Sequence, residues 1–92
     1  MKSGAKMVVQ GTVQGIFFRQ FVKGHAEDLK LRGFVRNLSN GDVEVIVEGE
    51  KENINRLFEF VKKGPEHSQI RHVGVTEKKW SGDFKEFKIL RF

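Results

Sequence analysis

Near its start, this 92-residue chain places an arginine directly behind a glycine and three large apolar residues, in the run Gly15-Ile16-Phe17-Phe18-Arg19. A glycine turn that leads into a helix leaves backbone N–H groups unpaired, and such groups bind anions. A cation in the first helical turn opposes the helix dipole unless an anion lies between them. A guanidinium also matches two phosphate oxygens. The run therefore favours phosphate binding, although an ordinary turn followed by a solvated arginine fits the spacing as well.

Other kinds of phosphate and metal chemistry lack their motifs. Neither GxGxxG nor GxxxxGK[ST] occurs, so nucleotide sites of those two types have no support. The absence of cysteine excludes disulfides, thiolate nucleophiles and cysteine-based zinc sites. His25 falls on an apolar helical stripe and is interpreted as a packed side chain, whereas His67 and His72 have no partner at a metal-ligand spacing.

Length and composition indicate a single globular domain over residues 1–92. The 17 basic residues exceed the 12 acidic ones and give a net charge of +5, which favours anionic partners. A solvated surface of mixed charge explains this balance equally well. The sequence shows no signal peptide and no apolar run that could span a bilayer, so a cytoplasmic location is expected. Abundant lysine and glutamate without cysteine suggests a heat-adapted source.

Hydrophobic periodicity predicts the elements that must position the arginine. Two helical stripes and five extended runs alternate along the chain. The predicted order is strand 5–13, helix 19–29, strands 33–38 and 42–48, a helix ending before Gly64-Pro65, and strands 70–79 and 84–92. Gly11 is expected to mark a bulge or a close approach. The Ser39-Asn40-Gly41 segment predicts a hairpin, whose register stays open between a two-residue and a four-residue turn.

Two helices that each bury one stripe, together with four or five strands, predict an α+β fold. The order favours a ferredoxin-like two-layer sandwich, βαββαβ, in which both helices cover one face of a mostly antiparallel sheet and a short C-terminal strand follows. This fold hosts many functions and selects none of them.

The run from Gly11 to Arg19, followed by Gly33-Phe34-Val35-Arg36-Asn37 at the matching distance, resembles the acylphosphatase family over nearly the whole chain. The resemblance implies that Arg19 binds the substrate phosphate and that Asn37 orients the attacking water. It further implies a phosphate-binding loop made of Gln14, Gly15, Ile16, Phe17, Phe18 and Arg19, with backbone N–H groups as donors. From its position alone, Asn37 could instead form the hairpin turn; as a site residue it is expected on a strand next to the first.

The reaction implied by the resemblance is hydrolysis of a small acyl phosphate to a carboxylate and inorganic phosphate, without metal or cofactor, by a monomer that needs no nucleic acid and no membrane. The chemistry agrees, because a carboxylate leaves without protonation and requires neither a general acid nor a strong nucleophile. The enzyme must still position the water and stabilise charge on the phosphoryl oxygens. An arginine, loop amides and an asparagine can do both. Phe17 and Phe18 are expected to anchor the loop to the core, with one ring lining the site.

Three residues depart from the family pattern: Ile16 replaces valine, Phe34 replaces tryptophan, and Lys30 stands where a glycine usually ends the first helix. A left-handed conformation at Lys30 would cost about 1 kcal/mol.

Two alternatives remain open. One is a nucleic-acid-binding ferredoxin-like module, because Arg32-Gly33-Phe34 begins like an RNA-recognition signature, although Val35 and Arg36 break it. The other is an acylphosphatase-like domain without a hydrolytic role, as in larger carbamoyl-transferring enzymes. Those enzymes typically carry proline where Gln20 follows the arginine here.

Overall fold

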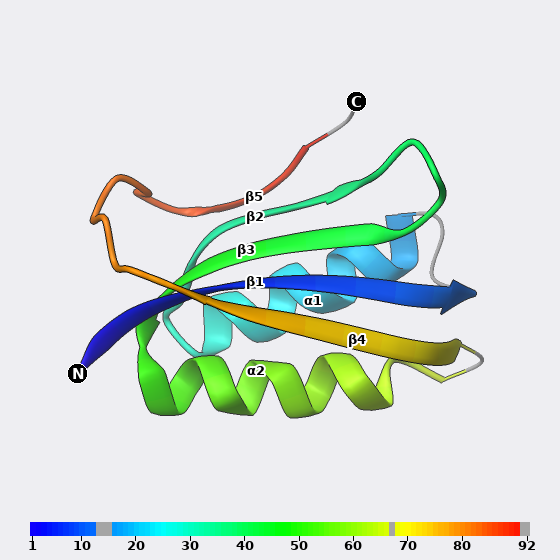
Figure 1. Ribbon diagram of the computed structural model, residues 1–92, viewed down its shortest axis with the longest axis horizontal. Helices are drawn as coiled ribbons and strands as arrows, with labels where there is room; N and C mark the ends of the chain where they lie inside the picture. Colours follow the sequence, from blue (N-terminus) through cyan, green and yellow to red (C-terminus); the bar gives the residue numbers. More distant parts are fainter. Residues whose placement is uncertain (13–15, 67, 91–92) are drawn as a thin grey trace.

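A computed structural model describes residues 1–12, 16–66 and 68–90 (Figure 1). Its elements are β1 (Lys2–Thr12), α1 (Ile16–Asp28), β2 (Arg32–Asn37), β3 (Val43–Glu50), α2 (Lys51–Lys63), β4 (Gln69–Lys78) and β5 (Phe87–Ile89). The predicted order is confirmed. Three elements differ most from the prediction: β1 and α1 each begin three residues earlier than expected, and β5 contains only three residues.

The five strands form one sheet in the order β4-β1-β3-β2-β5, and α1 and α2 lie together on one of its faces (Figure 1). All neighbouring strands are antiparallel except β2 and β5. The predicted ferredoxin-like sandwich is therefore confirmed. The expectation that Asn37 lies on a strand next to the first is wrong, because β3 separates β2 from β1. A helix is about 10 Å wide, roughly twice the strand spacing, so the β1-α1-β2 crossover leaves room for a strand between.

The hydrophobic core lies between the sheet and the helices. Strand alternation sends every second side chain of β1 and β3 to the helix-covered face, as Met7, Val9 and Val45 show. The buried stripes of the helices, which include Val22 and Leu57, close the core from the other side. α1 packs mainly on β2 and β5, whereas α2 packs on β1, β3 and β4.

Two glycines have the roles that the sequence predicts. The register of β1 and β4 shifts between Gln10 and Gly11, where the backbone has a φ of 144°. A Cβ at Gly11 would collide with the carbonyl oxygen of Gln69, so this position requires a close approach. In the β2–β3 hairpin, Gly41 has a φ of 93° and donates its N–H to the Leu38 carbonyl.

The hairpin loop contains three residues, which is neither of the two lengths considered from the sequence. Asn37 pairs with Val43, and the Leu38 N–H donates to the Asp42 carbonyl across the loop at 2.7 Å. A turn from Leu38 to Gly41 with a positive φ at its last residue is a common way to close such loops.

α1 is terminated, two residues after Asp28, by Lys30, which has a φ of 58° and is the one non-glycine residue with positive φ in the described ranges. The Lys30 N–H donates to the Glu27 carbonyl at 3.0 Å, and the Leu31 N–H donates to the Ala26 carbonyl at 2.8 Å. This pair of bonds forms a Schellman motif, in which the left-handed position normally holds glycine. Lys30 therefore adopts the left-handed conformation whose cost the sequence raises.

Candidate active site

Both predicted catalytic residues lie at one end of the molecule. β1 and β2 run in the same direction, because each is antiparallel to β3. α1 starts where β1 ends and returns along β2, so its first turn and the end of β2 lie at the same end of the sheet (Figure 1). This arrangement brings the elements that carry Arg19 and Asn37 together.

Arg19 is half-buried in the first turn of α1. Ile16, Phe17 and Phe18 precede it in the same turn, so the described part of the expected loop is already helical; Gln14 and Gly15 lie outside the described residues. The first turn of a helix has backbone N–H groups without intrahelical partners, and these groups favour an anion. The local backbone therefore suits a phosphate cradle.

The two phenylalanines before the arginine differ sharply. The Phe18 side chain is 3% exposed and belongs to the core, as expected for an anchor. Phe17 is 84% exposed, so its expected role as a second core anchor is wrong. Neighbouring residues on a helix point about 100° apart, and only one of the two can face the sheet.

Asn37 is the last residue of β2 and pairs with Val43. It follows Val35 at the two-residue interval of the strand and so shares the helix-covered face with that buried residue. Among the described residues, its side-chain Oδ1 is buried without a hydrogen-bond donor. Leaving a buried acceptor unpaired costs about 1–3 kcal/mol, so such a group requires an explanation, and a catalytic role is one such explanation.

The alternative role of Asn37 as a turn former is not supported. The hairpin turn is stabilised by Asn40, whose Oδ1 accepts a hydrogen bond from the Asp42 N–H at 3.0 Å. The Asn40 Nδ2 also donates to the Asp42 carboxylate at 3.1 Å. Asn37 therefore lies before the turn, and its amide is not used to form it.

On the opposite face of the sheet, the buried Glu44 carboxylate binds two cations. Arg36 donates its Nε–H to Glu44 Oε1 at 2.7 Å, and the Lys6 Nζ lies 3.4 Å from Glu44 Oε2. The two central strands β1 and β3 carry no aromatic residue on either face. An RNA-recognition sheet needs aromatic rings on this surface, so the nucleic-acid alternative is not favoured.

His25 packs between the helices, as its place on the apolar stripe predicts. Its ring stacks on Phe60 of α2 at 3.9 Å between centroids and contacts Phe21 edge-on at 4.6 Å. Within residues 1–12, 16–66 and 68–90, no group of three or more His, Cys, Asp or Glu side chains is placed to hold a metal ion.

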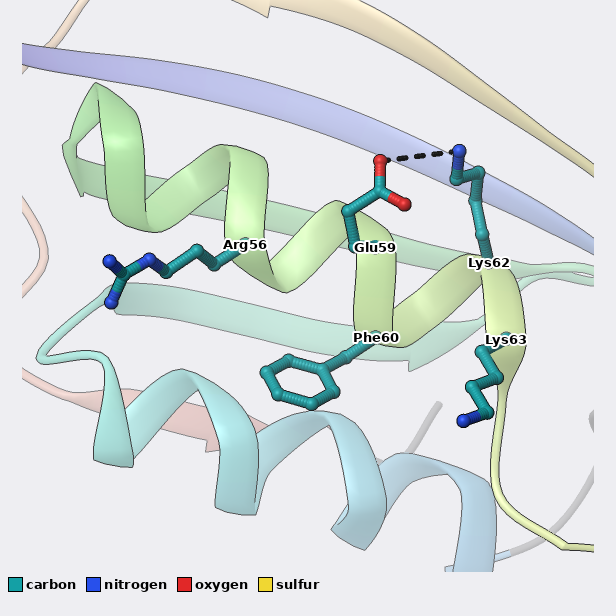
Figure 2. Close-up of a pocket in the computed structure, with 5 residues that line it drawn as sticks. All are labelled: Arg56, Glu59, Phe60, Lys62 and Lys63. Atoms are coloured by element: carbon teal, nitrogen blue, oxygen red, sulfur yellow. Dashed lines mark ion pairs between the residues drawn. The ribbon is translucent and has the colours of Figure 1, made fainter.

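A hollow of about 600 Å³ lies on α2, beside the Phe60 ring (Figure 2). Figure 2 shows Phe60 pointing toward α1 and an ion pair of 3.2 Å between Glu59 and Lys62. Every lining residue that the structure describes comes from this single helix, and neither Arg19 nor Asn37 is among them. We therefore place the candidate site at the start of α1 and the end of β2.

Known proteins resemble this chain in both sequence and fold. The acylphosphatase family model matches residues 5–89. An acylphosphatase from Syntrophus aciditrophicus is 38% identical over 98% of this chain and 94% of its own length. The crystal structure of acylphosphatase from Bacillus subtilis superposes with a TM-score of 0.91 at 34% identity, covering 99% of this chain and all of that one. Full-length HypF also matches, at 29% identity and a TM-score of 0.86, over 99% of this chain and 12% of that chain.

The described parts of the chain contain no helix that is long and apolar enough to cross a membrane.

Proposed function

Because this chain belongs to the acylphosphatase family, we propose that it hydrolyses small acyl phosphates to a carboxylate and inorganic phosphate, with Arg19 and Asn37 as its catalytic residues. Family and fold support the reaction. The observation that carries the assignment of residues is the buried, unpaired Oδ1 of Asn37 at the end of the molecule where α1 begins.

In this mechanism Arg19 and the N–H groups of the phosphate-binding loop hold the phosphoryl oxygens. The Asn37 Oδ1 accepts a hydrogen bond from the attacking water and orients its oxygen toward phosphorus. The new P–O bond forms as the bond from phosphorus to the acyl oxygen breaks, and the carboxylate leaves with that electron pair. The proton of the water ends on phosphate. The arginine and the amides stabilise charge on the phosphoryl oxygens during transfer.

The carboxylate is a good leaving group, so the reaction requires neither a metal ion nor an organic cofactor. The enzyme acts as a monomer with one domain, residues 1–92, in the cytoplasm. Its substrate is a small molecule, and nucleic acid is not a partner. The aromatic-free sequences of β1 and β3 support this last point, because RNA-recognition sheets stack bases on aromatic rings.

Hydrolysis of benzoyl phosphate, followed by ultraviolet absorbance with EDTA present, tests the proposal. We expect wild-type turnover in EDTA. Arg19→Ala and Asn37→Ala should each lower kcat/KM by about 100-fold or more, the usual effect of removing one group that stabilises or positions the transition state. Arg56→Ala and Asn55→Ala are matched controls on the exposed face of α2 and should retain wild-type rates.

Hydrolysis that persists at wild-type rates in both site variants would refute the residue assignment. Complete inactivity of the wild-type protein would refute the hydrolytic function and favour a domain without a catalytic role. Binding of single-stranded RNA at physiological salt, measured by a gel-shift assay at two salt concentrations, would revive the nucleic-acid alternative.

A further inference from the structure

A second cavity, of about 260 Å³, opens at the other end of the sheet from Arg19 and Asn37. Its lining includes Arg32, the first residue of β2, whereas Asn37 is the last residue of the same strand. Five strand steps separate the two residues, which corresponds to roughly 17 Å. The cavity is therefore separate from the proposed catalytic site.

Three basic side chains from different segments line this cavity. Lys2 comes from the start of β1, Lys30 from the turn between α1 and β2, and Arg32 from the start of β2. Among the residues that the structure describes, neither Lys30 nor Arg32 forms an ion pair. The folded chain thus brings together cations whose charge is not matched by a contacting carboxylate.

Both carboxylates that line the cavity already have partners elsewhere. Glu48 accepts hydrogen bonds from the Ser81 N–H at 2.9 Å, the Ser81 hydroxyl at 2.7 Å and the Gly82 N–H at 3.0 Å. Glu50 forms an ion pair of 2.8 Å with the N-terminal ammonium group. The lining cations outnumber these two carboxylates, so the electrostatic balance favours an anionic ligand.

The backbone at Lys30 gives a second, independent indication. Its φ of 58° suits glycine better than lysine, and the Schellman motif would form equally well with glycine. A lysine in a strained backbone conformation, at a residue that lines a cavity, is the kind of local conflict that often marks a functional site.

The third feature is an aromatic wall. Trp80 is 47% exposed at the cavity, and the Lys2 ammonium lies 5.2 Å from the centre of its ring. Phe84 lines the cavity as well, fixed by edge-to-face packing on Phe34 at 6.0 Å. A half-exposed indole beside cations suits a ligand that carries both a planar ring and a negative charge.

We propose that this cavity binds an aromatic monophosphate of mononucleotide size, with its phosphate at Lys30 and Arg32 and its ring against Trp80. The guanidinium of Arg32 supplies a fork for two phosphate oxygens, and the Lys30 ammonium adds a second charge. The ligand is not the acyl phosphate substrate, and the proposal does not depend on the hydrolytic reaction.

Trp80 is the only tryptophan in the chain, so its fluorescence reports this cavity directly. The experiment titrates the protein with AMP and excites the indole at the red edge of its absorption, where adenine does not absorb. We expect a saturable change in emission. Adenosine and inorganic phosphate, tested separately, should each bind at least about tenfold more weakly, because each makes only part of the contacts.

Lys30→Gly is the most informative variant, because removing the positive-φ lysine should raise the unfolding midpoint while weakening AMP binding about tenfold. Loss of binding therefore cannot be attributed to misfolding. Arg32→Gln should weaken AMP binding to a similar extent. Lys23→Gln changes the net charge by the same amount at a residue that pairs with Glu27 and does not line the cavity, and should leave the affinity within twofold.

Absence of a saturable change with wild-type protein, or wild-type affinity in Lys30→Gly, would overturn the proposal. Equal affinity for inorganic phosphate and AMP would overturn the contact between ring and indole. Hydrolysis of benzoyl phosphate by Lys30→Gly serves as a separate readout, and we expect it to remain within twofold of wild type. Failure of the hydrolytic proposal would leave the fluorescence result unaffected.

Discussion

The unpaired amide oxygen of Asn37 is expected to lower the stability of the fold while it serves the reaction, and substitution of this one residue measures both effects. Replacing a buried, unsatisfied acceptor with an apolar group of similar size removes its desolvation cost. We expect Asn37→Val to be at least as stable as wild type, with a gain of up to about 1–2 kcal/mol, because valine also suits a strand. Its kcat/KM for benzoyl phosphate should fall about 100-fold.

Urea denaturation and initial rates test this prediction. Val43→Ala serves as a comparison, since it removes apolar volume from the strand position opposite Asn37 and should lower stability. If Asn37→Val were strongly destabilised, the amide oxygen would have to form a stabilising contact, and its assignment to the water would lose its main support.

For single residues, the sequence predicts which residues belong to the candidate site better than it predicts which side chains are buried. The resemblance places Arg19 and Asn37 in the site, and the structure places both at the same end of the sheet. The exposure of Phe17 was mispredicted. Burial of a helical residue depends on which side of α1 it faces, and this depends on the residue where the helix begins. The apolar stripe from Phe18 through Val22 and Ala26 already omits Phe17 and held the correct signal.

Among the elements, the connection between β4 and β5 depends on the Glu48 carboxylate. Burial raises the pKa of Glu48, but its hydrogen bonds from Ser81 and Gly82 outweigh this effect and hold the pKa below the ordinary value of 4.5. A carboxyl group whose pKa is lowered on folding stabilises the protein above its unfolded pKa. That contribution is lost as the pH falls through the lower, folded value.

We therefore expect Glu48→Gln to reduce the free energy of unfolding by about 1–3 kcal/mol at neutral pH, since a charge-assisted set of hydrogen bonds is lost. The difference from wild type should shrink as the pH falls below 4.5, where wild-type Glu48 itself becomes protonated. Urea denaturation at several pH values measures this difference in the free energy of unfolding.

Glu86→Gln is the control: it removes an exposed carboxylate paired with Lys88 at 3.7 Å and should change stability by less than about 0.5 kcal/mol. A difference that is independent of pH would contradict this account.

Element types and order follow from periodicity, whereas registers and the last strand do not. The register of a hairpin depends on the geometry of its turn. Here the three-residue loop closes with a turn and a positive φ at Gly41, and the alternation of polar and apolar residues does not predict this geometry. β5 is shorter than its apolar pattern indicates. It pairs with β2 only from Phe87 to Ile89, and Phe84, at the start of the predicted strand, packs edge-on against Phe34 instead.

For the whole molecule, the common core predicts cooperative unfolding. Leu57 is fully buried at the contact between α2 and the sheet, and Trp80 lies outside that contact, beside the second cavity. We expect Leu57→Ala to cost about 2–5 kcal/mol. Tryptophan fluorescence and far-ultraviolet circular dichroism should nevertheless give the same urea midpoint, because a single small domain unfolds in one step.

Arg56→Ala, at the adjacent exposed position, is the control and should shift the midpoint little. Separate midpoints for the two signals would show that the sheet end beside Trp80 unfolds independently and would contradict a single domain over residues 1–92.

The position of β1 has a consequence for the synthesis of the chain. β1 is made first, yet its two neighbours in the sheet are β3 and β4, and Gly4 pairs with Lys78 near the far end of the sequence. Such non-local pairing makes folding slow compared with helical proteins of the same size. On the ribosome, one edge of β1 must therefore stay unpaired until β4 has emerged, and nascent chains that are cut short before β4 expose that edge to aggregation.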